Sequence, residues 1–372
     1  MDVFTTPAAW LGGSTATIRF CRAAPDPRFE RFVRDCFAQI EFRPGAPEPL
    51  LELRDVVFFP RWASLYDATG RRIDETCVRR SPRLVVQEHF SGPPSMPVPR
   101  QAPVIEGPVL FLGKQFDHWG HFLTEGISRF WPLGSDPALA DLPILAPGLE
   151  KIAPEHNVMA CLRDSDLSLD QVLRPAGPVR LARCLVPMPS FTNRAQVFEG
   201  HARFPQAAGE RVLAGTAPPR SDQPVYLSRT RLSHKAHNTP EGEAALEAGL
   251  AARGVLVVHP QELSYAEQVR IYRGHRRFIG CSGSAFFNTA FARPKEVATY
   301  ALRIGLPHPT YLMMDAILGV EAHYLDTLHP TEGAADAPLT AANIRPPRGA
   351  ARIDVDATLG WLAELGVISR GR

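Results

Sequence analysis

Short apolar runs alternate with helical patterns along the second half of the chain. Buried strands are predicted at residues 225–228, 255–258, 277–280 and 297–300. Thr239-Pro240 and the capping box Ser264–Glu267 open helices between these strands, and a third helix is predicted over 285–291. Because this alternation is typical of a parallel sheet with crossover helices, residues 225–330 are predicted to form a Rossmann-like domain.

The first half shows a similar but less regular alternation. Strands are predicted at 51–59, 83–88, 108–113, 142–146 and 179–186. One helix follows Asp26-Pro27, and another is predicted to run from Trp119 until Pro132 ends it. We therefore expect an N-terminal α/β domain over residues 1–205.

Two further segments have little apolar patterning. Residues 206–224 are rich in Ala, Gly and Pro, which predicts a linker between the two domains. Residues 331–372 form a tail whose final helix, over 357–365, we expect to pack back on the N-terminal domain. The predicted fold class is thus α/β with two domains.

Composition narrows the classes of partner and compartment. A net charge of +2 gives no reason to expect nucleic acid. The six cysteines are scattered with no CxxC pair, as in a reduced, cytoplasmic protein. The N-terminus lacks a basic region followed by an apolar core, and no apolar stretch approaches the ~18 residues of a membrane span. This predicts a soluble protein and leaves peripheral membrane association open.

The first candidate site lies on the helix predicted from Trp119. His121, Glu125, Ser128 and Arg129 follow one another at helical spacing, so a base, an acid and a cation would share one face. The helix follows the predicted strand 108–113, and open α/β sheets bind ligands at the carboxyl ends of their strands. The structural alternative is a solvated face with a helix-stabilising His–Glu pair.

The second candidate site is the turn Ser282-Gly283-Ser284, between a predicted strand and helix. Unpaired N–H groups and the helix dipole favour an anion there, although such corners are also common in purely structural roles. Arg229 ends a neighbouring strand and Lys235 follows it, so both cations are expected on the same rim of the sheet. A diphosphate would then be held from two sides.

Other catalytic motifs do not fit. Gly280–Ser284 lacks the last glycine of the G-x-S-x-G elbow, and the chain has no P-loop and no GxGxxG. His118, His121 and Glu125 would not face one point on a regular helix, and HExxH is missing. No metal site is expected there.

Two sequence blocks resemble glycosyltransferase family 61. The first, His121-Phe-Leu-Thr-Glu125 followed by Arg129-Phe-Trp131, is similar to the family's His-(Trp/Phe)-Leu-x-Glu helix and its Arg-Leu-Trp. The second runs from Tyr226-Leu-Ser-Arg229 to Gly283-Ser284 and Asn288, and is similar to the family's Tyr-(Ile/Leu)-Ser-Arg and Gly-(Ala/Ser)-x-x-x-Asn blocks. The chain departs from the family where His118 replaces Asn and Ser282 replaces His.

The resemblance implies a GT-B architecture, in which two Rossmann-like domains face a cleft. It also implies inverting, metal-independent transfer of a sugar from a nucleotide-sugar co-substrate to a hydroxyl of a glycan. The expected pathway is capsule, exopolysaccharide or lipopolysaccharide synthesis at the inner face of the membrane. The donor is expected to be UDP-linked, and the acceptor a glycan or lipid-linked glycan, with no cofactor and no metal.

Roles follow for the residues of both blocks. His121 or Glu125 would take the acceptor proton, and we favour His121, oriented by Glu125, because an imidazole titrates nearer neutral pH. Asp117, His118 and Arg129 are expected to contact substrate, with Arg129 the alternative charge partner of Glu125. The donor would be bound by Arg229, Lys235, Ser282, Gly283, Ser284 and Asn288.

Two alternatives remain open at this stage. One is a non-catalytic nucleotide- or glycan-binding protein on the same fold, because both blocks carry a departure from the family pattern. The other is a metal-dependent transferase, because Asp164-Ser-Asp166 matches the short Asp-x-Asp pattern that binds a divalent cation in another class of sugar transferases.

Overall fold

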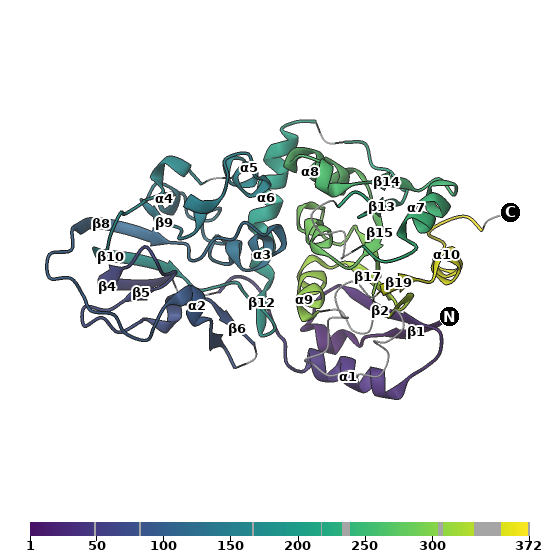
Figure 1. Cartoon of the computed structure of the whole chain (residues 1–372), viewed down its shortest axis with the longest axis horizontal. Coiled ribbons are helices and arrows are strands. Elements are labelled where there is room, and N and C mark those ends of the chain that lie inside the picture. The colour runs from purple at the N-terminus through teal and green to yellow at the C-terminus, as the bar shows by residue number, and fades with distance from the viewer. Residues whose placement is uncertain are drawn as a thin grey trace. The chain divides into compact units, whose positions relative to one another are not determined.

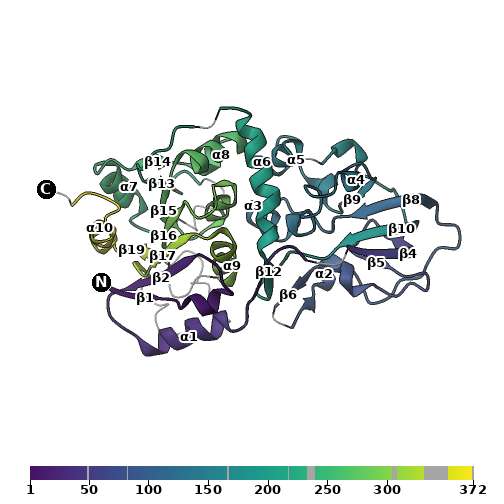
Figure 2. The same cartoon turned by 180° about the vertical axis from the view of Figure 1, so that it is seen from behind.

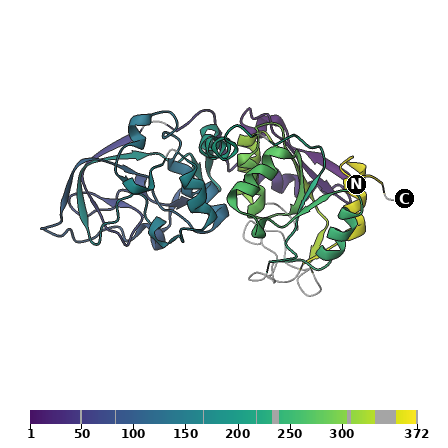
Figure 3. The same cartoon turned by 90° about the horizontal axis from the view of Figure 1, so that it is seen from above.

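The computed structural model describes residues 1–47, 50–81, 83–165, 167–216, 218–232, 239–303, 308–330 and 351–370. The chain divides into two compact units, which we call unit 1 (residues 1–38 and 213–372) and unit 2 (residues 39–212). Both contain a sheet and helices, as Figure 1, Figure 2 and Figure 3 show, so the predicted α/β class is confirmed. No helix in the described ranges is both long and apolar enough to cross a membrane.

Unit 1 is built on a seven-stranded sheet in the order β1-β2-β17-β16-β15-β13-β14. Its strands are β1 (Asp2–Thr5), β2 (Thr17–Arg22), β13 (Val225–Leu227), β14 (Leu256–Val258), β15 (Arg277–Cys281), β16 (Ala298–Leu302) and β17 (Glu321–Leu325). All neighbours are parallel except β1 and β2. The parallel sheet predicted for residues 225–330 is therefore confirmed.

Unit 1 contains the helices α1 (Pro27–Phe37), α7 (Glu243–Ala251), α8 (Tyr265–Gly274), the 3₁₀ helix η9 (Ser284–Phe291), α9 (Pro309–Leu318) and α10 (Val355–Glu364). The four from α7 to α9 connect parallel strands of the sheet. The predicted caps position two of these helices, since Asp26 caps α1 and the Ser264–Glu267 capping box opens α8. A short ribbon of β18 (Leu328–Pro330) and β19 (Ala351–Ile353) precedes α10.

The order of strands creates a topological switch point in unit 1. From β13 the chain passes through α7 to β14 on one side, and then through α8 to β15 on the other side. The connection that follows β13 therefore runs to one side of the sheet and the connection that follows β15 runs to the other, so the strand order reverses between these two strands. Open α/β sheets bind their ligands at this kind of position.

The division of the chain differs from the expected domain boundaries. Residues 1–38 belong to unit 1, because β2 pairs in parallel with β17 and buries Ile18 and Phe20 in the sheet. The helix α6 (Arg203–Leu213) occupies the start of the segment predicted as a linker. The tail helix α10 packs on α7 within unit 1, where Leu362 joins the core. The expected domains were consecutive stretches of sequence, so these long-range contacts were missed. An apolar pattern alone does not show which sheet a strand joins or which helix it packs against.

Unit 2 contains a five-stranded sheet in the order β5-β4-β10-β8-β9. The strands are β4 (Leu50–Phe58), β5 (Leu65–Tyr66), β8 (Val104–Phe111), β9 (Ile144–Leu145) and β10 (Val179–Pro187). β8 runs parallel to both β9 and β10, so a second switch point lies between the ends of β8 and β10. The core of this sheet holds buried side chains from all five strands, namely Phe58, Leu65, Val109, Leu145 and Leu181 with their neighbours.

Shorter elements complete unit 2. Three strands, β3 (Glu41–Arg43), β11 (Phe191–Thr192) and β12 (Gln196–Phe198), form a small sheet, and β6 (Arg79–Arg80) pairs with β7 (Val85–Val86). The helices are α2 (Glu88–Ser91), α3 (Trp119–Thr124), α4 (Pro137–Ala140), α5 (Asn157–Arg163) and α6. The loop from β8 to α3 starts at the switch point of this unit.

Candidate functional site

The helix α3 carries the first candidate site of unit 2. His118 caps it by accepting a hydrogen bond from the His121 N–H, at 3.4 Å. The α-helix ends at Thr124, and the chain continues as a 3₁₀ helix, η3 (Gly126–Arg129). A 3₁₀ helix advances by 3.0 rather than 3.6 residues per turn. The predicted stripe of four residues is therefore reduced to His121 and Glu125.

Glu125 is the centre of a buried ion pair network. Its carboxylate accepts hydrogen bonds from His121 Nδ1 at 2.6 Å and from Arg80 Nε and Nη2 at 2.9 and 3.2 Å. Its side chain is 5% exposed, whereas that of His121 is 39% exposed. Burial alone would raise the pKa of Glu125, but the hydrogen bonds from His121 and Arg80 outweigh it and hold that pKa below its usual range. Glu125 is therefore an ionised carboxylate.

Sequence reasoning missed Arg80. This arginine lies on β6, far from α3 in the sequence, and its neighbours form no periodic pattern. β7 and a bridge to Asn193 hold β6 in place, so tertiary structure alone brings the guanidinium to Glu125. An Arg-Arg pair in a short polar segment carries no recognisable signal.

Arg129 does not pair with Glu125, contrary to one of its expected roles. Arg129 is 4% exposed, and its guanidinium donates to the backbone oxygens of Pro187 and, at 2.7 Å, Glu75. Burial lowers the pKa of Arg129 to about 10. Gly113 faces it so closely that an added Cβ would lie 3.2 Å from the Arg129 side chain. Arg129 thus ties η3 to the end of β10 and to the segment at Glu75 within unit 2.

Aromatic rings border the exposed edge of His121. Phe116 lies 5.6 Å from its ring and His118 lies 4.9 Å from it, while Phe90 in turn lies 5.6 Å from Phe116. The amine of Lys114 faces the rings of both Phe90 and Phe116. Asp117 and His118 are exposed next to these rings, where both can reach a ligand. A polar base beside apolar ring surfaces is typical of a small-molecule site.

The second candidate site lies at the switch point of unit 1. Arg229 follows β13, and its Nη2 donates to the backbone oxygens of Cys281, at 3.0 Å, and Ser282. The prediction that Arg229 and the Ser282–Ser284 turn share one rim is therefore confirmed. Gly283 leaves room for this guanidinium, because an added Cβ would collide with it and force it to move.

Two glutamates of α7 fix the loop that carries Arg229. Glu243 accepts from the Arg229 N–H at 2.8 Å and from the Tyr226 hydroxyl at 3.1 Å. Burial raises the pKa of Glu243, although the contacts with Arg229 and Tyr226 lower it in part. Glu247 accepts from the hydroxyl of Ser228 at 2.6 Å. The sequence pointed to neither glutamate, because on an amphipathic helix both match a solvent-facing pattern.

The other predicted residues of this site differ in what they can reach. Ser282 uses its N–H and hydroxyl to donate to Leu302, at 2.9 and 3.2 Å, whereas Ser284 is half-buried at the start of η9. Asn288 is fully buried and donates to Gln268 at 2.7 Å, so it fastens η9 to α8 and does not reach a ligand directly. Lys235 lies outside the described residues.

The alternative metal site concerns Asp164 and Asp166. Asp164 lies at the C-cap of α5, and Asp166 is outside the described residues. Among the residues that the structure describes, no group of three or more His, Cys, Asp or Glu side chains is placed to hold a metal ion.

Comparisons with known proteins agree with the two sequence blocks. Residues 119–299 match the model of a family described as Glycosyltransferase 61, and this range includes His121, Glu125, Arg229 and the Ser282–Ser284 turn. No curated protein matches the chain. The chain thus carries a glycosyltransferase 61 domain, and the protein is a glycosyltransferase.

Proposed function

We propose that the protein is an inverting, metal-independent glycosyltransferase. It moves a sugar from a nucleotide-sugar donor to a hydroxyl of a glycan or lipid-linked glycan in bacterial capsule, exopolysaccharide or lipopolysaccharide synthesis. The observation that carries the proposal is the hydrogen bond of 2.6 Å between His121 Nδ1 and the ionised Glu125.

This hydrogen bond supports His121 as the catalytic base. When Nδ1 carries the proton that bonds Glu125, Nε2 keeps its lone pair for the acceptor hydroxyl. Glu125 is the weaker candidate, because three hydrogen bonds already engage its carboxylate and lower its pKa. The negative charge of Glu125 then stabilises the imidazolium that forms on proton transfer.

The acceptor hydroxyl attacks the anomeric carbon as His121 removes its proton. The new glycosidic bond forms while the bond to the nucleotide diphosphate breaks on the opposite face of the sugar, and the configuration inverts. Proton transfer of this kind contributes roughly 10²–10⁴-fold to a rate. Phe116 and His118 would border the acceptor sugar, and exposed Asp117 would accept from one of its hydroxyls.

The donor would bind at the switch point between β13 and β15. Arg229, Lys235 and the start of η9 at Ser284 would stabilise the negative charge that develops on the departing diphosphate. Gly283 leaves room for Arg229 there, and Asn288 holds η9 in position. Charge stabilisation by arginine and backbone N–H groups supports a reaction without a metal ion.

We further propose a GT-B enzyme, in which unit 1 binds a UDP-linked donor and unit 2 supplies the base and the acceptor site. Unit 1 has a mostly parallel sheet, and unit 2 has a mixed sheet in which β8, β9 and β10 are parallel; a switch point in each unit supports this division of labour. The same proposal has the enzyme work in the cytoplasm at the inner face of the membrane, where the glycan precursor is extended.

Binding measurements with nucleotides test this proposal. Calorimetry and thermal shifts would compare UDP, GDP, CMP and their sugars, with and without a chelator. We expect one nucleotide to stabilise the protein equally in both conditions, with the effect lost in Arg229→Ala and kept in Glu125→Gln. Absence of stabilisation by every nucleotide, or its loss with the chelator, contradicts the proposal.

A further inference from the structure

A cavity of about 590 Å³ lies in unit 2, next to the strand that carries Arg80. Ile73 and Pro94 form part of its wall. The remaining lining residues are three arginines and three acids, Asp67, Arg71, Arg72, Asp74, Glu75 and Arg79. The proposed reaction assigns no role to the side chains of these residues.

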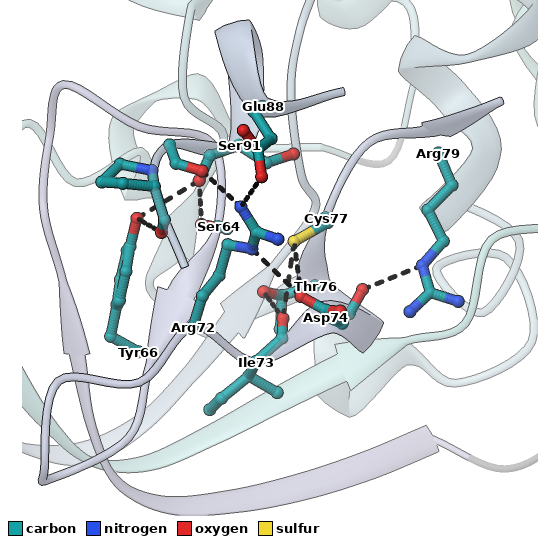
Figure 4. A network of polar contacts seen from close by, with 12 residues as sticks. Ser64, Tyr66, Arg72, Ile73, Asp74, Thr76, Cys77, Arg79, Glu88 and Ser91 are labelled. Atoms are coloured by element: carbon teal, nitrogen blue, oxygen red, sulfur yellow. Dashed lines mark hydrogen bonds and ion pairs between the residues drawn. The ribbon is translucent and has the colours of Figure 1, made fainter. Parts of the chain in front are cut away.

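Hydrogen bonds and ion pairs of Arg72 hold one part of the cavity wall. Figure 4 shows Arg72 at the centre of a polar network, where its Nε donates to Asp74 at 3.0 Å and its Nη1 lies 3.6 Å from Glu88. Its Nη1 also donates to the backbone oxygen of Gly92, and its side chain is only 7% exposed. This part of the wall is therefore ordered without a ligand, which limits the ordering cost of binding.

Three side chains at the cavity keep hydrogen-bonding capacity for a ligand. Arg79 donates through Nε to the Asp74 carbonyl at 3.1 Å, as Figure 4 shows. Among the described residues, no hydrogen bond or ion pair engages the Nη1 and Nη2 of Arg79, the Arg71 guanidinium or the Glu75 carboxylate. The cavity therefore offers a ligand both hydrogen-bond donors, from the two arginines, and acceptors, from the glutamate carboxylate.

The charges around the cavity select the class of ligand. A phosphate or carboxylate would face three acids, and a cation would face three guanidinium groups, so like charges oppose each. A neutral sugar avoids both penalties, because each hydroxyl can donate to a carboxylate and accept from an arginine. Ile73 and Pro94 add the apolar surface that the C–H groups of a sugar ring need.

The cavity is connected to the catalytic residues through the chain itself. Arg79 lines the cavity, and the next residue, Arg80, holds Glu125. The Glu75 carbonyl accepts from Arg129, and α2 carries both Glu88 of the network and Phe90 of the ring cluster near His121. We propose that this cavity binds a neutral sugar unit of the acceptor glycan, remote from the reacting hydroxyl; this inference rests on the proposed function.

Ligand-observed NMR with an oligosaccharide panel tests the inference. The probes are neutral hexose oligosaccharides and counterparts of the same length that carry uronic acids. Wild-type protein is expected to bind neutral probes in preference to acidic ones. Glu75→Gln and Arg79→Gln are each expected to weaken that binding by roughly tenfold or more, since each loses charge-assisted hydrogen bonds. Arg83→Gln, an exposed change outside the cavity, is the matched control and retains binding.

The outcomes separate this inference from the proposed function. Glu125→Gln should keep the neutral probe, and all variants should keep nucleotide-dependent stabilisation, which also shows that they are folded. Preference for acidic probes, equal binding by wild type and both cavity variants, or no binding of any neutral probe overturns the inference. Failure of every nucleotide to bind contradicts the proposed function instead.

Discussion

Arg80 donates to both carboxylate oxygens of Glu125, at 2.9 and 3.2 Å. This paired contact leaves Glu125 buried and ionised, with His121 as its third donor. A carboxylate held in this way orients an imidazole and stabilises its charged form, as in a His–Asp pair of a hydrolase. We therefore expect the hydrogen bond of 2.6 Å between Glu125 and His121 to orient the imidazole of His121 as a base.

His121→Asn is expected to lower kcat by roughly 10²–10⁴-fold, because the substitution removes the proposed base and keeps a polar side chain of similar size. Nucleotide binding should be unchanged, since the proposed donor site belongs to unit 1. The measurement is the rate of nucleotide release from the donor, with thermal shift by the nucleotide as the control. A variant that keeps wild-type kcat would exclude His121 as the base.

Arg80→Gln is expected to move the acid limb of the pH–rate profile to higher pH. Burial raises the pKa of Glu125, and this variant removes one of the two donors that offset burial. Activity should then fall more at acid pH than at alkaline pH, whereas Arg80→Lys should restore part of it by keeping the charge. A purely structural role for Arg80 would lower the rate equally at all pH values.

The same pair has a predictable effect on stability. The pKa of Glu125 is lower in the folded state than in the unfolded state. Glu125 therefore stabilises the folded protein at pH values above its unfolded-state pKa of about 4.3, and this stabilisation is lost as the pH falls through its folded-state pKa. The stability difference between wild type and Arg80→Gln should therefore shrink in acid. Urea unfolding at several pH values measures this difference.

The two catalytic candidates of α3 were predictable from the sequence because residues at i and i+4 meet on any helix. Arg80 was not, because its position depends on a two-stranded ribbon with no apolar signature. The burial of Arg129 was missed for a related reason. The chain becomes a 3₁₀ helix at Gly126, and this change directs the Arg129 side chain toward the interior of the protein. The local sequence does not clearly predict the change.

The sheet of unit 1 shows the same limit at the level of the fold. The strands within residues 225–330 were predictable, because helix-capping residues and short apolar runs alternate there at regular intervals. The addition of β2 to β17 joins residues separated by most of the chain, and only tertiary packing decides that pairing. The switch point between β13 and β15 follows from strand order, which a linear pattern does not contain.

Gly283→Ala is expected to destabilise the protein by about 1–3 kcal/mol and to weaken nucleotide binding. The new Cβ would collide with the Arg229 guanidinium, which must then move from the Cys281 carbonyl. Combining it with Arg229→Ala should recover part of the lost stability, because the collision disappears. Gly360→Ala is the matched control in unit 1, where an added Cβ meets open space. Additive effects of the two changes would contradict this account.

Asp315→Asn is expected to flatten the pH dependence of stability between about pH 4 and pH 7. Asp315 is buried on α9 and accepts from the Tyr324 hydroxyl, and burial raises its pKa to about 7. A raised folded-state pKa contributes stability that is fully present below the unfolded value of about 3.9 and is lost as pH rises through about 7. The neutral amide can still accept from Tyr324, so the variant should be a few kcal/mol more stable than wild type above pH 7 and little changed at pH 4. Thermal unfolding of both proteins across this range is the measurement, and a parallel pH dependence would show that Asp315 does not carry the effect.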